Sequence, residues 1–334
     1  MTRGRSGGER PTMEMVAQRA GVSKITVSRA LRGSALVRPE LREKIAEAAK
    51  QAGYRMNVAA RTLRTRRSHT IAVVVEQLSR GDRPIADPLL LSIIGGLLEA
   101  LTPLGYALIL TTQAHFLTSN AMGADGIVAI GEGEGGAGLR EMVGFDLPLI
   151  AWGEPILGLD IKVIGSDNRQ GGKVAAEHLV AAGRRRLLFL GDAEHPEVAA
   201  RLEGVREVLA ASEAVLAGVL PCPFTIEGGA AALAGALDMS LAFDAVVAAS
   251  DFIAAGACDA LVARGVTVPR EVAIVGFDDT PIAAAHRPPL SSIRQDGLGA
   301  GQALGRAIVA LIENTPGLAL KPLPVELVVR ASSS

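Results

Sequence analysis

Cysteine and long apolar runs are scarce in this 334-residue chain. Its two cysteines, Cys222 and Cys258, have no metal-like or redox-like spacing, which favours a reducing compartment such as the cytoplasm. No apolar run approaches the roughly eighteen residues of a membrane-spanning helix, so no contact with a membrane is expected. The basic start MTRGRSGGER is not followed by an apolar stretch, so we expect residues 1–10 to be a disordered tail rather than a secretory signal.

Catalytic patterns are lacking as well. The five histidines are scattered, no G-x-S-x-G occurs, and neither cysteine has a paired-histidine signature. One pattern does favour an enzyme, because residues 131–136 read GEGEGG and satisfy the G-x-G-x-x-G of dinucleotide-binding loops. Two glutamates in that loop would repel a pyrophosphate, and the loop follows the third predicted strand of its lobe rather than the first. We therefore expect no enzyme, no cofactor and no metal site.

Charge is divided unevenly along the chain. Residues 1–67 hold 16 Lys and Arg against 5 Asp and Glu, whereas the rest of the chain holds 18 against 30. With hydrophobic residues at 49% and charged residues at 21%, the whole chain has the composition of a well-cored soluble protein. A basic module attached to an acidic body indicates a polyanionic partner for the module, although a solvated basic helix face would give a similar count.

Residues 11–56 predict three short helices around a tight turn. Thr12 and Ser23 are good capping residues for the first two helices, and Gly21 permits the turn between them. Pro39 suits the first position of the third helix. This is the helix-turn-helix plan, in which the second helix enters the major groove of DNA.

The second predicted helix has a polar, basic outer side that a generic three-helix bundle would not need. We expect Lys24, Ile25 and Arg29 to reach base edges, and the hydroxyl groups between them to bind phosphates. The expected DNA contacts of this unit are Thr12, Ser23, Lys24, Ile25, Thr26, Ser28 and Arg29.

VAQRAGVSKITVSRALRG, followed by VRPELREKIAEAAKQAGYRMNVAARTLRTRRS, resembles the DNA-binding segment of the lactose-repressor/galactose-repressor (LacI/GalR) family. The resemblance covers nearly all of residues 12–68 and implies a hinge helix and linker at 57–68. In that family the hinge helices of a dimer enter the minor groove, and a leucine from each is wedged into a base step. Asn57, Ala60 and Leu63 match the hinge contacts, with Leu63 as the wedge; an ordinary core leucine is the alternative.

Residues 69–332 alternate short apolar runs with helical stretches, which predicts doubly wound α/β layers. The expected buried parallel strands are 70–75, 107–110, 126–130, 147–152, 187–191, 244–250 and 272–277. The expected helices between them include 89–101, 171–182, 198–211 and 252–264.

The family resemblance continues through IGSDNRQGGKVAAEHLVAAGRRRLLFLGD, VPREVAIVGFDDTP and PVELVVR. It implies a body similar to periplasmic sugar-binding proteins, with ligand in a cleft between two α/β lobes joined by three crossovers. We expect lobe one at about 69–165 and 292–323, and lobe two at about 166–291 and 324–330. The crossovers are expected near Gly165, Pro289–Ile293 and Pro322–Pro324. Between 111 and 125 the chain is too short for the full helix that is usual in the family.

The resemblance also implies a set of ligand contacts. Arg201 matches an arginine that binds hydroxyls or carboxylates, Asp278 matches a carboxylate that accepts from sugar hydroxyls, and Ser250 stands where many members have asparagine. Trp152 and Phe224 offer flat faces for a sugar ring, with core packing as the alternative, and Gln295 reaches in from the third crossover. A forked donor, a carboxylate and apolar faces suit a polyol.

Together these features predict a cytoplasmic, nucleoid-associated transcriptional regulator. We expect a homodimeric repressor that binds double-stranded operator DNA and is controlled by a sugar-like effector. A periplasmic solute-binding protein would explain the body of the chain, but not the basic amino-terminal module or the missing export signal.

Overall fold

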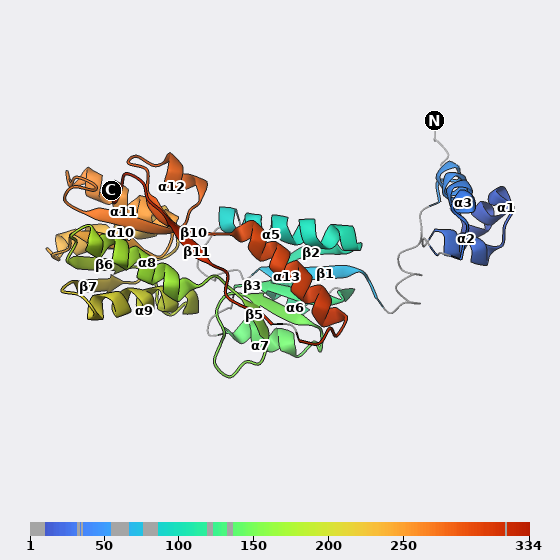
Figure 1. Cartoon of the computed structure of the whole chain (residues 1–334), viewed down its shortest axis with the longest axis horizontal. Helices are drawn as coiled ribbons and strands as arrows, with labels where there is room; N and C mark the ends of the chain where they lie inside the picture. The colour runs from blue at the N-terminus through green and yellow to red at the C-terminus, as the bar shows by residue number, and fades with distance from the viewer. Residues whose placement is uncertain are drawn as a thin grey trace, which may run out of the picture. The chain divides into compact units, whose positions relative to one another are not determined.

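A computed structural model of the chain describes residues 11–31, 34, 36–54, 67–75, 86–118, 123–131, 136–317 and 319–334. The chain divides into two compact units, residues 1–68 and 69–334 (Figure 1). The expected tail at 1–10 and the expected hinge contacts Asn57, Ala60 and Leu63 lie outside the described residues, as does most of the GEGEGG loop.

The amino-terminal unit is the expected bundle of short helices. Its helices are α1 (Met13–Ala20), α2 (Lys24–Ala30) and α3 (Pro39–Gln51). The side chain of Thr12 caps α1 and that of Ser23 caps α2, each by accepting a backbone N–H of the first turn. Gly21 ends α1 with φ of 70°, a left-handed conformation that glycine adopts without strain. Val16, Val27 and Ile45, one from each helix, are fully buried and form the centre of a small core.

The second unit begins with a parallel sheet in the order β2-β1-β3-β4-β5. Its strands are β1 (Thr70–Val75), β2 (Ala107–Thr112), β3 (Gly126–Ile130), β4 (Leu149–Trp152) and β5 (Lys162–Ile164). The helical segments of this lobe are α5 (Pro88–Leu101), η1 (Thr102–Leu104), α6 (Gln113–Thr118), α7 (Ala137–Val143) and α13 (Gly297–Ile312). Between 111 and 125, where the sequence predicts no full helix, the described residues contain the six-residue α6, and residues 119–122 lie outside the description.

Both faces of this first sheet are covered, which is why its strands read as continuous apolar runs. Ile71 and Val73 of β1 pack with α5 and α13 on one face, while Ala72 and Val74 pack with Phe116 of α6 and with α7 on the other. Helices α5 and α13 pack against each other although they are far apart in the sequence (Figure 1).

The second lobe contains a sheet in the order β11-β10-β9-β8-β6-β7. Its strands are β6 (Arg186–Leu190), β7 (Val215–Leu220), β8 (Ala245–Ala248), β9 (Ala273–Asp278), β10 (Ser291–Gln295) and β11 (Val325–Val328). Its helices are α8 (Asn168–Ala181), α9 (Pro196–Ala210), α10 (Ile226–Asp238), α11 (Asp251–Ala263) and α12 (Pro281–Ala285). The pair α8 and α9 covers one face and the pair α10 and α11 the other (Figure 1). The α/β prediction is confirmed, with β11 added as an antiparallel edge strand.

The chain crosses between the lobes in three places, and the second crossing comes later than the sequence suggested. Residues 292–295 were assigned to lobe one, but they belong to β10, which pairs with β9 and β11 in the second sheet. The crossing follows Gln295. The first and third crossings lie side by side, because Leu323 N–H donates to Gly165 O and Leu323 O accepts from Asp167 N–H, both at 2.8 Å.

Among the described helices, none combines the length and apolarity that crossing a bilayer requires.

Candidate functional site

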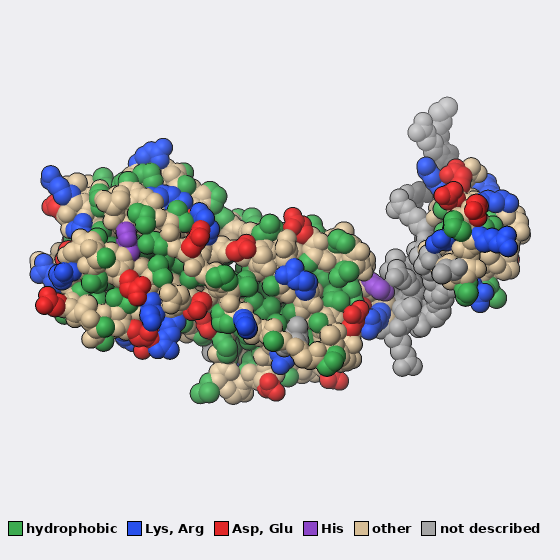
Figure 2. All heavy atoms as spheres, in the orientation of Figure 1, with side chains coloured by type: hydrophobic (Ala, Val, Ile, Leu, Met, Phe, Trp, Pro, Cys, Tyr) green, Lys and Arg blue, Asp and Glu red, His purple; other side chains and the backbone are tan. Residues whose placement is uncertain are grey.

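Helix α2 presents the expected DNA-reading side chains on its outer side. Ile25 is 64% exposed, which is unusual for so large an apolar side chain, and Lys24 and Arg29 are exposed beside it. The opposite side of α2 buries Val27 and Ala30 in the core of the unit. Figure 2 shows Lys and Arg side chains over much of the visible face of this unit, with acidic side chains gathered near its top. An exposed apolar side chain flanked by cations fits a groove, where it can contact thymine methyl groups while the cations meet phosphates and guanine.

The expected hydroxyl contacts also have local roles. Thr12 Oγ1 accepts from Met15 N–H at 3.3 Å, and Ser23 Oγ accepts from Thr26 N–H at 3.2 Å while lying 2.9 Å from Thr26 Oγ1. Ser28 is half-buried on the outer side of α2. These caps hold the first turns of both helices in place, so the same residues shape the surface that they are expected to offer to phosphates.

Lys24 Nζ lies 3.2 Å from Glu14 Oε2, and both side chains are 60% exposed. An ion pair so open to water is worth at most about 1 kcal/mol. Lys24 can therefore exchange this partner for DNA at little cost.

Most of the expected ligand contacts lie at or just beyond the carboxyl ends of strands. Trp152 ends β4, Asp278 ends β9, and Gln295 ends β10, while Ser250 follows β8 by two residues. The carboxyl edge of an open parallel sheet is where α/β proteins place ligands, because strand ends and helix starts leave backbone and side-chain groups available there. The expected location of Gln295 was wrong, because this residue belongs to the second sheet rather than to the first lobe.

Arg201 of α9 reaches the same sheet edge, because it bonds to the carbonyl of Ala249 directly after β8, and it is only 3% exposed. Its Nε donates to Asn168 Oδ1 at 2.8 Å, and its Nη1 donates to the carbonyl of Ala249. The guanidinium carbon lies 3.7 Å from the centroid of the Phe277 ring, a cation–π arrangement. These contacts replace the water that a buried cation gives up, and they fix the direction of the guanidinium before any ligand arrives.

The close approach of α8 and α9 explains how Arg201 reaches Asn168. A Cβ on Gly172 of α8 would lie 1.9 Å from the carbonyl oxygen of Arg201, and a Cβ on Gly204 of α9 would lie 2.0 Å from that of Arg169. Only glycine at both positions allows the two helix backbones to touch. The glycines therefore set the distance between the arginine and its amide partner.

Asp278 belongs to a second buried polar group. It is 5% exposed, has φ of 104°, and accepts from Gln295 Nε2 at 2.5 Å. Asp251 lies close enough for the two charges to interact, and it is held by Thr280 N–H at 2.6 Å and Ser292 Oγ at 2.5 Å. Burial raises the pKa of Asp251 above its ordinary value, and the charge of Asp278 acts in the same direction.

Three expected contacts have structural roles that the sequence did not reveal. Ser250 caps α11 by accepting from Ile253 N–H at 3.3 Å, so its hydroxyl is engaged locally. Phe224 is 3% exposed, packs in the core of the second lobe and meets His195 edge-on at 5.5 Å. Trp152 is half-buried against the core beneath α5 and α13. Both aromatic residues thus have the core packing that was the alternative in the sequence analysis, and their contact with a ligand stays a prediction.

Three residues that sequence reasoning missed complete the cluster. Asn168 starts α8 in the second lobe, Glu154 follows β4 in the first, and Asn168 Nδ2 donates to Glu154 Oε1 at 2.8 Å. Phe277 is the ring beneath Arg201. The sequence offered one indication for Glu154, its place as a polar residue just beyond a predicted strand. For Asn168 the one indication was its place in the first turn of a helix.

The Asn168–Glu154 bond joins the two lobes, and through Asn168 it connects Glu154 to Arg201. Burial raises the pKa of the Glu154 carboxyl above its ordinary value. The hydrogen bond from Asn168 and the charge of Arg201 oppose that shift, while Glu197 and Asp167 add to it. The carboxyl edges of both sheets therefore share one hydrogen-bonded chain.

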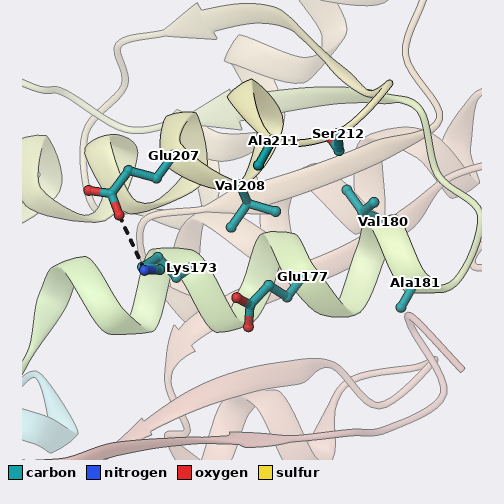
Figure 3. A pocket seen from close by; sticks show the side chains of 8 residues that line it. All are labelled: Lys173, Glu177, Val180, Ala181, Glu207, Val208, Ala211 and Ser212. Carbon is teal, nitrogen blue, oxygen red and sulfur yellow. Dashed lines mark ion pairs between the residues drawn. The ribbon is translucent and has the colours of Figure 1, made fainter.

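Other surfaces offer less chemistry. A shallow hollow between α8 and α9, lined by Lys173, Glu177 and Glu207 among others, includes none of the expected site residues (Figure 3). Burial raises the pKa of Cys222 and of Cys258 to about 12, so both thiols are unreactive. Within the part of the chain that the structure describes, no group of His, Cys, Asp and Glu side chains is arranged to hold a metal ion.

Comparison with known proteins decides the family. The family model for bacterial regulatory proteins of the lacI family matches residues 12–57, and that for the periplasmic binding protein-like domain matches residues 176–333. The chain is 34% identical to the HTH-type transcriptional regulator CelR of Thermobifida fusca, over 97% of this chain and 98% of the relative. The chain belongs to the lacI family.

Solved structures agree with this lacI-family assignment. A complex of the transcriptional regulator CelR with cellobiose is 31% identical and covers 97% of this chain and 100% of its own, with a TM-score of 0.72. A lac repressor dimer bound to operator is 22% identical, covers 97% of this chain and 99% of its own, and has a TM-score of 0.84, which shows the shared fold.

This lacI-family member is a DNA-binding regulator of transcription and not an enzyme. The dinucleotide interpretation of GEGEGG is therefore wrong. The family assignment also excludes the periplasmic solute-binding protein, because the matched DNA-binding domain occupies residues 12–57.

Proposed function

We propose that this chain represses transcription from an operator and that a sugar or sugar derivative, bound between the two lobes, controls its affinity for DNA. The observation that carries the proposal is the polar chain from half-buried Glu154 through buried Asn168 to buried Arg201, which joins the lobes. With Asp278 and Gln295 nearby at the same sheet edge, it combines carboxylates, amides and a guanidinium, the groups that recognise hydroxyls. The cellobiose complex of a relative adds support.

The effector acts by selecting one arrangement of the lobes. A ligand shifts an equilibrium between two arrangements only when it binds one of them more tightly. Glu154 belongs to the first lobe, whereas Arg201 and Asp278 belong to the second. A ligand that contacts both sides favours the arrangement in which they lie close together, and in our proposal that arrangement fits the operator less well.

DNA is read by the amino-terminal unit in this proposal. Lys24, Ile25 and Arg29 contact base edges in the major groove, and the capped helix starts bring Ser23 and Thr26 to phosphates. Leu63 acts as the minor-groove wedge, and Asn57 and Ala60 supply the other hinge contacts that the family resemblance implies.

The protein acts as a homodimer, on the nucleoid in the bacterial cytoplasm, where its operator lies. Leu91 and Leu98 of α5 are 51% and 53% exposed, and a spacing of seven residues places them on one side of that helix. Leu110 on the edge strand β2 is 50% exposed. Exposed leucines on the outer helix and edge strand of one lobe are typical of a surface covered by a second copy.

The test is selection of binding sites from random DNA, followed by titration of the selected operator with and without sugars, sugar acids and purines. We expect a near-palindromic site with half-sites about one helical turn apart. A fragment of residues 69–334, which is a compact unit, should respond to the same effector in a thermal-shift assay without binding DNA. An asymmetric site, or an operator affinity that no compound of the panel changes, would contradict the proposal.

A further inference from the structure

Carboxylates outnumber cations among the charges that act on Glu154. These charges are those of Glu197 and Asp167, which are negative, and that of Arg201, which is positive. Glu154 is half-buried and Arg201 is 3% exposed. Water therefore screens their charges only in part, and a further anion placed beside Glu154 meets a like charge at close range.

The guanidinium of Arg201 is also poorly arranged for binding an anion through two hydrogen bonds. Recognition of a carboxylate or phosphate by arginine uses a pair of donors, either Nε with Nη2 or Nη1 with Nη2. Nε already donates to Asn168 Oδ1 at 2.8 Å, and Nη1 donates to the carbonyl of Ala249. Each pair thus has one nitrogen engaged, and the ring of Phe277 covers one face of the guanidinium at 3.7 Å.

Resting on the proposed function, we propose that the effector is an uncharged polyol, a neutral sugar, and that Glu154 excludes sugar acids and sugar phosphates. Sugar hydroxyls suit the cluster because each one donates to a carboxylate such as Asp278 and accepts from an amide or guanidinium N–H. An acidic sugar replaces one donor with an anion that the carboxylates repel. Specificity built on such repulsion does not require additional contacts with the preferred ligand.

Glu154 is the residue assigned to this exclusion because it brings a carboxylate from the first lobe to the group around Arg201. It keeps that position through the 2.8 Å bond from Asn168 Nδ2. Glu154→Gln retains an oxygen that accepts this bond and removes the charge. The variant therefore distinguishes an effect of the carboxylate charge on an anionic ligand from an effect of losing the hydrogen bond to Asn168.

The experiment uses the full chain and pairs of a neutral sugar with an anionic derivative of that sugar. The pairs are glucose with gluconate, glucose with glucose 6-phosphate, cellobiose with cellobionate, and ribose with ribose 5-phosphate. Thermal shift identifies the responding pair, and titration calorimetry then gives both affinities. We expect the neutral member to bind at least about tenfold more tightly than its anionic partner in the wild type. Glu154→Gln should reduce that ratio by about tenfold or more.

Glu141→Gln, at an exposed position on α7, is the matched control and should leave the ratio unchanged. Tighter binding of the anionic member by the wild type would overturn this inference while leaving effector control intact. An unchanged ratio in Glu154→Gln would overturn the role of Glu154. If no sugar of either charge bound, the proposed function would fail, and this inference with it.

Discussion

The guanidinium carbon of Arg201 lies 3.7 Å from the centre of the Phe277 ring, and Phe277 directly precedes Asp278 at the end of β9. One strand end therefore supplies both the aromatic surface beneath the arginine and a carboxylate of the proposed ligand site. The arginine itself comes from α9, whose approach to α8 is set by glycine. The site therefore depends on the packing of Phe277 beneath Arg201 and on the close approach of α8 and α9. Separate substitutions can disturb each of these.

Arg201→Ala should weaken effector binding about ten- to a hundredfold, because a charged hydrogen bond contributes on the order of 1.5–3 kcal/mol. Operator affinity without effector should stay near the wild-type value, since Arg201 lies in the second unit and α2 in the first. Operator titrations with and without the effector measure both quantities. Arg206→Ala, on the same helix and largely exposed, is the control. A variant at position 201 that responds at the wild-type effector concentration would show that the ligand binds elsewhere.

Gly172→Ala should push α9 away from α8, because the new Cβ would lie 1.9 Å from the backbone oxygen of Arg201. Overpacking of this kind costs about 1–3 kcal/mol of stability, and here it should also lengthen the Arg201–Asn168 bond and weaken effector binding. Gly235→Ala is the control, since nothing lies within 4 Å of a Cβ built there in α10. Chemical denaturation and calorimetry give stability and affinity. Equal effects of the two substitutions would argue against the close approach of the helices.

The sequence predicted the central strands well because they are continuous apolar runs, as in β1 and β9. It did not predict β10, whose sequence SSIRQ is largely polar. Ser291 and Ser292 are nevertheless fully buried, because their hydroxyls bond to Arg330 O and Asp251, about 40 residues away. Hydrogen-bond partners so distant in the sequence leave no local pattern of apolar residues that would predict a strand. For that reason the sequence analysis placed the second crossing between the lobes too early.

The positions of some expected site residues follow from family resemblance. Arg201, Asp278 and Gln295 lie at the carboxyl edge of the second sheet, and their contact with a ligand stays a prediction. Glu154 and Asn168 were missed because their importance arises from a contact between lobes, which no spacing along the chain encodes.

Ile25→Ala and Lys24→Ala should each change the base preference of the half-site. A good base contact contributes about 1–3 kcal/mol of discrimination, so specific affinity should fall roughly five- to a hundredfold while salt-sensitive nonspecific binding persists. Selection from random DNA with each variant, followed by affinity measurement, tests this. Lys50→Ala on the exposed side of α3 should leave the selected sequence unchanged. Recovery of the wild-type sequence by both α2 variants would rule out α2 as the reading helix.

Leu98→Glu should shift the protein from dimer to monomer by placing a charge on the exposed leucine surface of α5. Sedimentation velocity at several protein concentrations measures the change. Leu157→Glu is the control: Leu157 is 97% exposed, so the same substitution should leave the dimer unchanged. A dimer of wild-type strength in Leu98→Glu would mean that another surface joins the subunits.

The antiparallel pairing of β11 with β10 has a consequence for how the protein is made. Ser332 and Ser333, just beyond β11, are buried, and Ser332 bonds to Ile274 O at 2.7 Å. The second sheet is therefore incomplete until residues 325–333 have emerged from the ribosome, whereas the helices α1 to α3, which have a core of their own, emerge much earlier. During each round of synthesis the nascent chain thus carries the DNA-reading unit before the lobes that hold the proposed effector site have completed their fold.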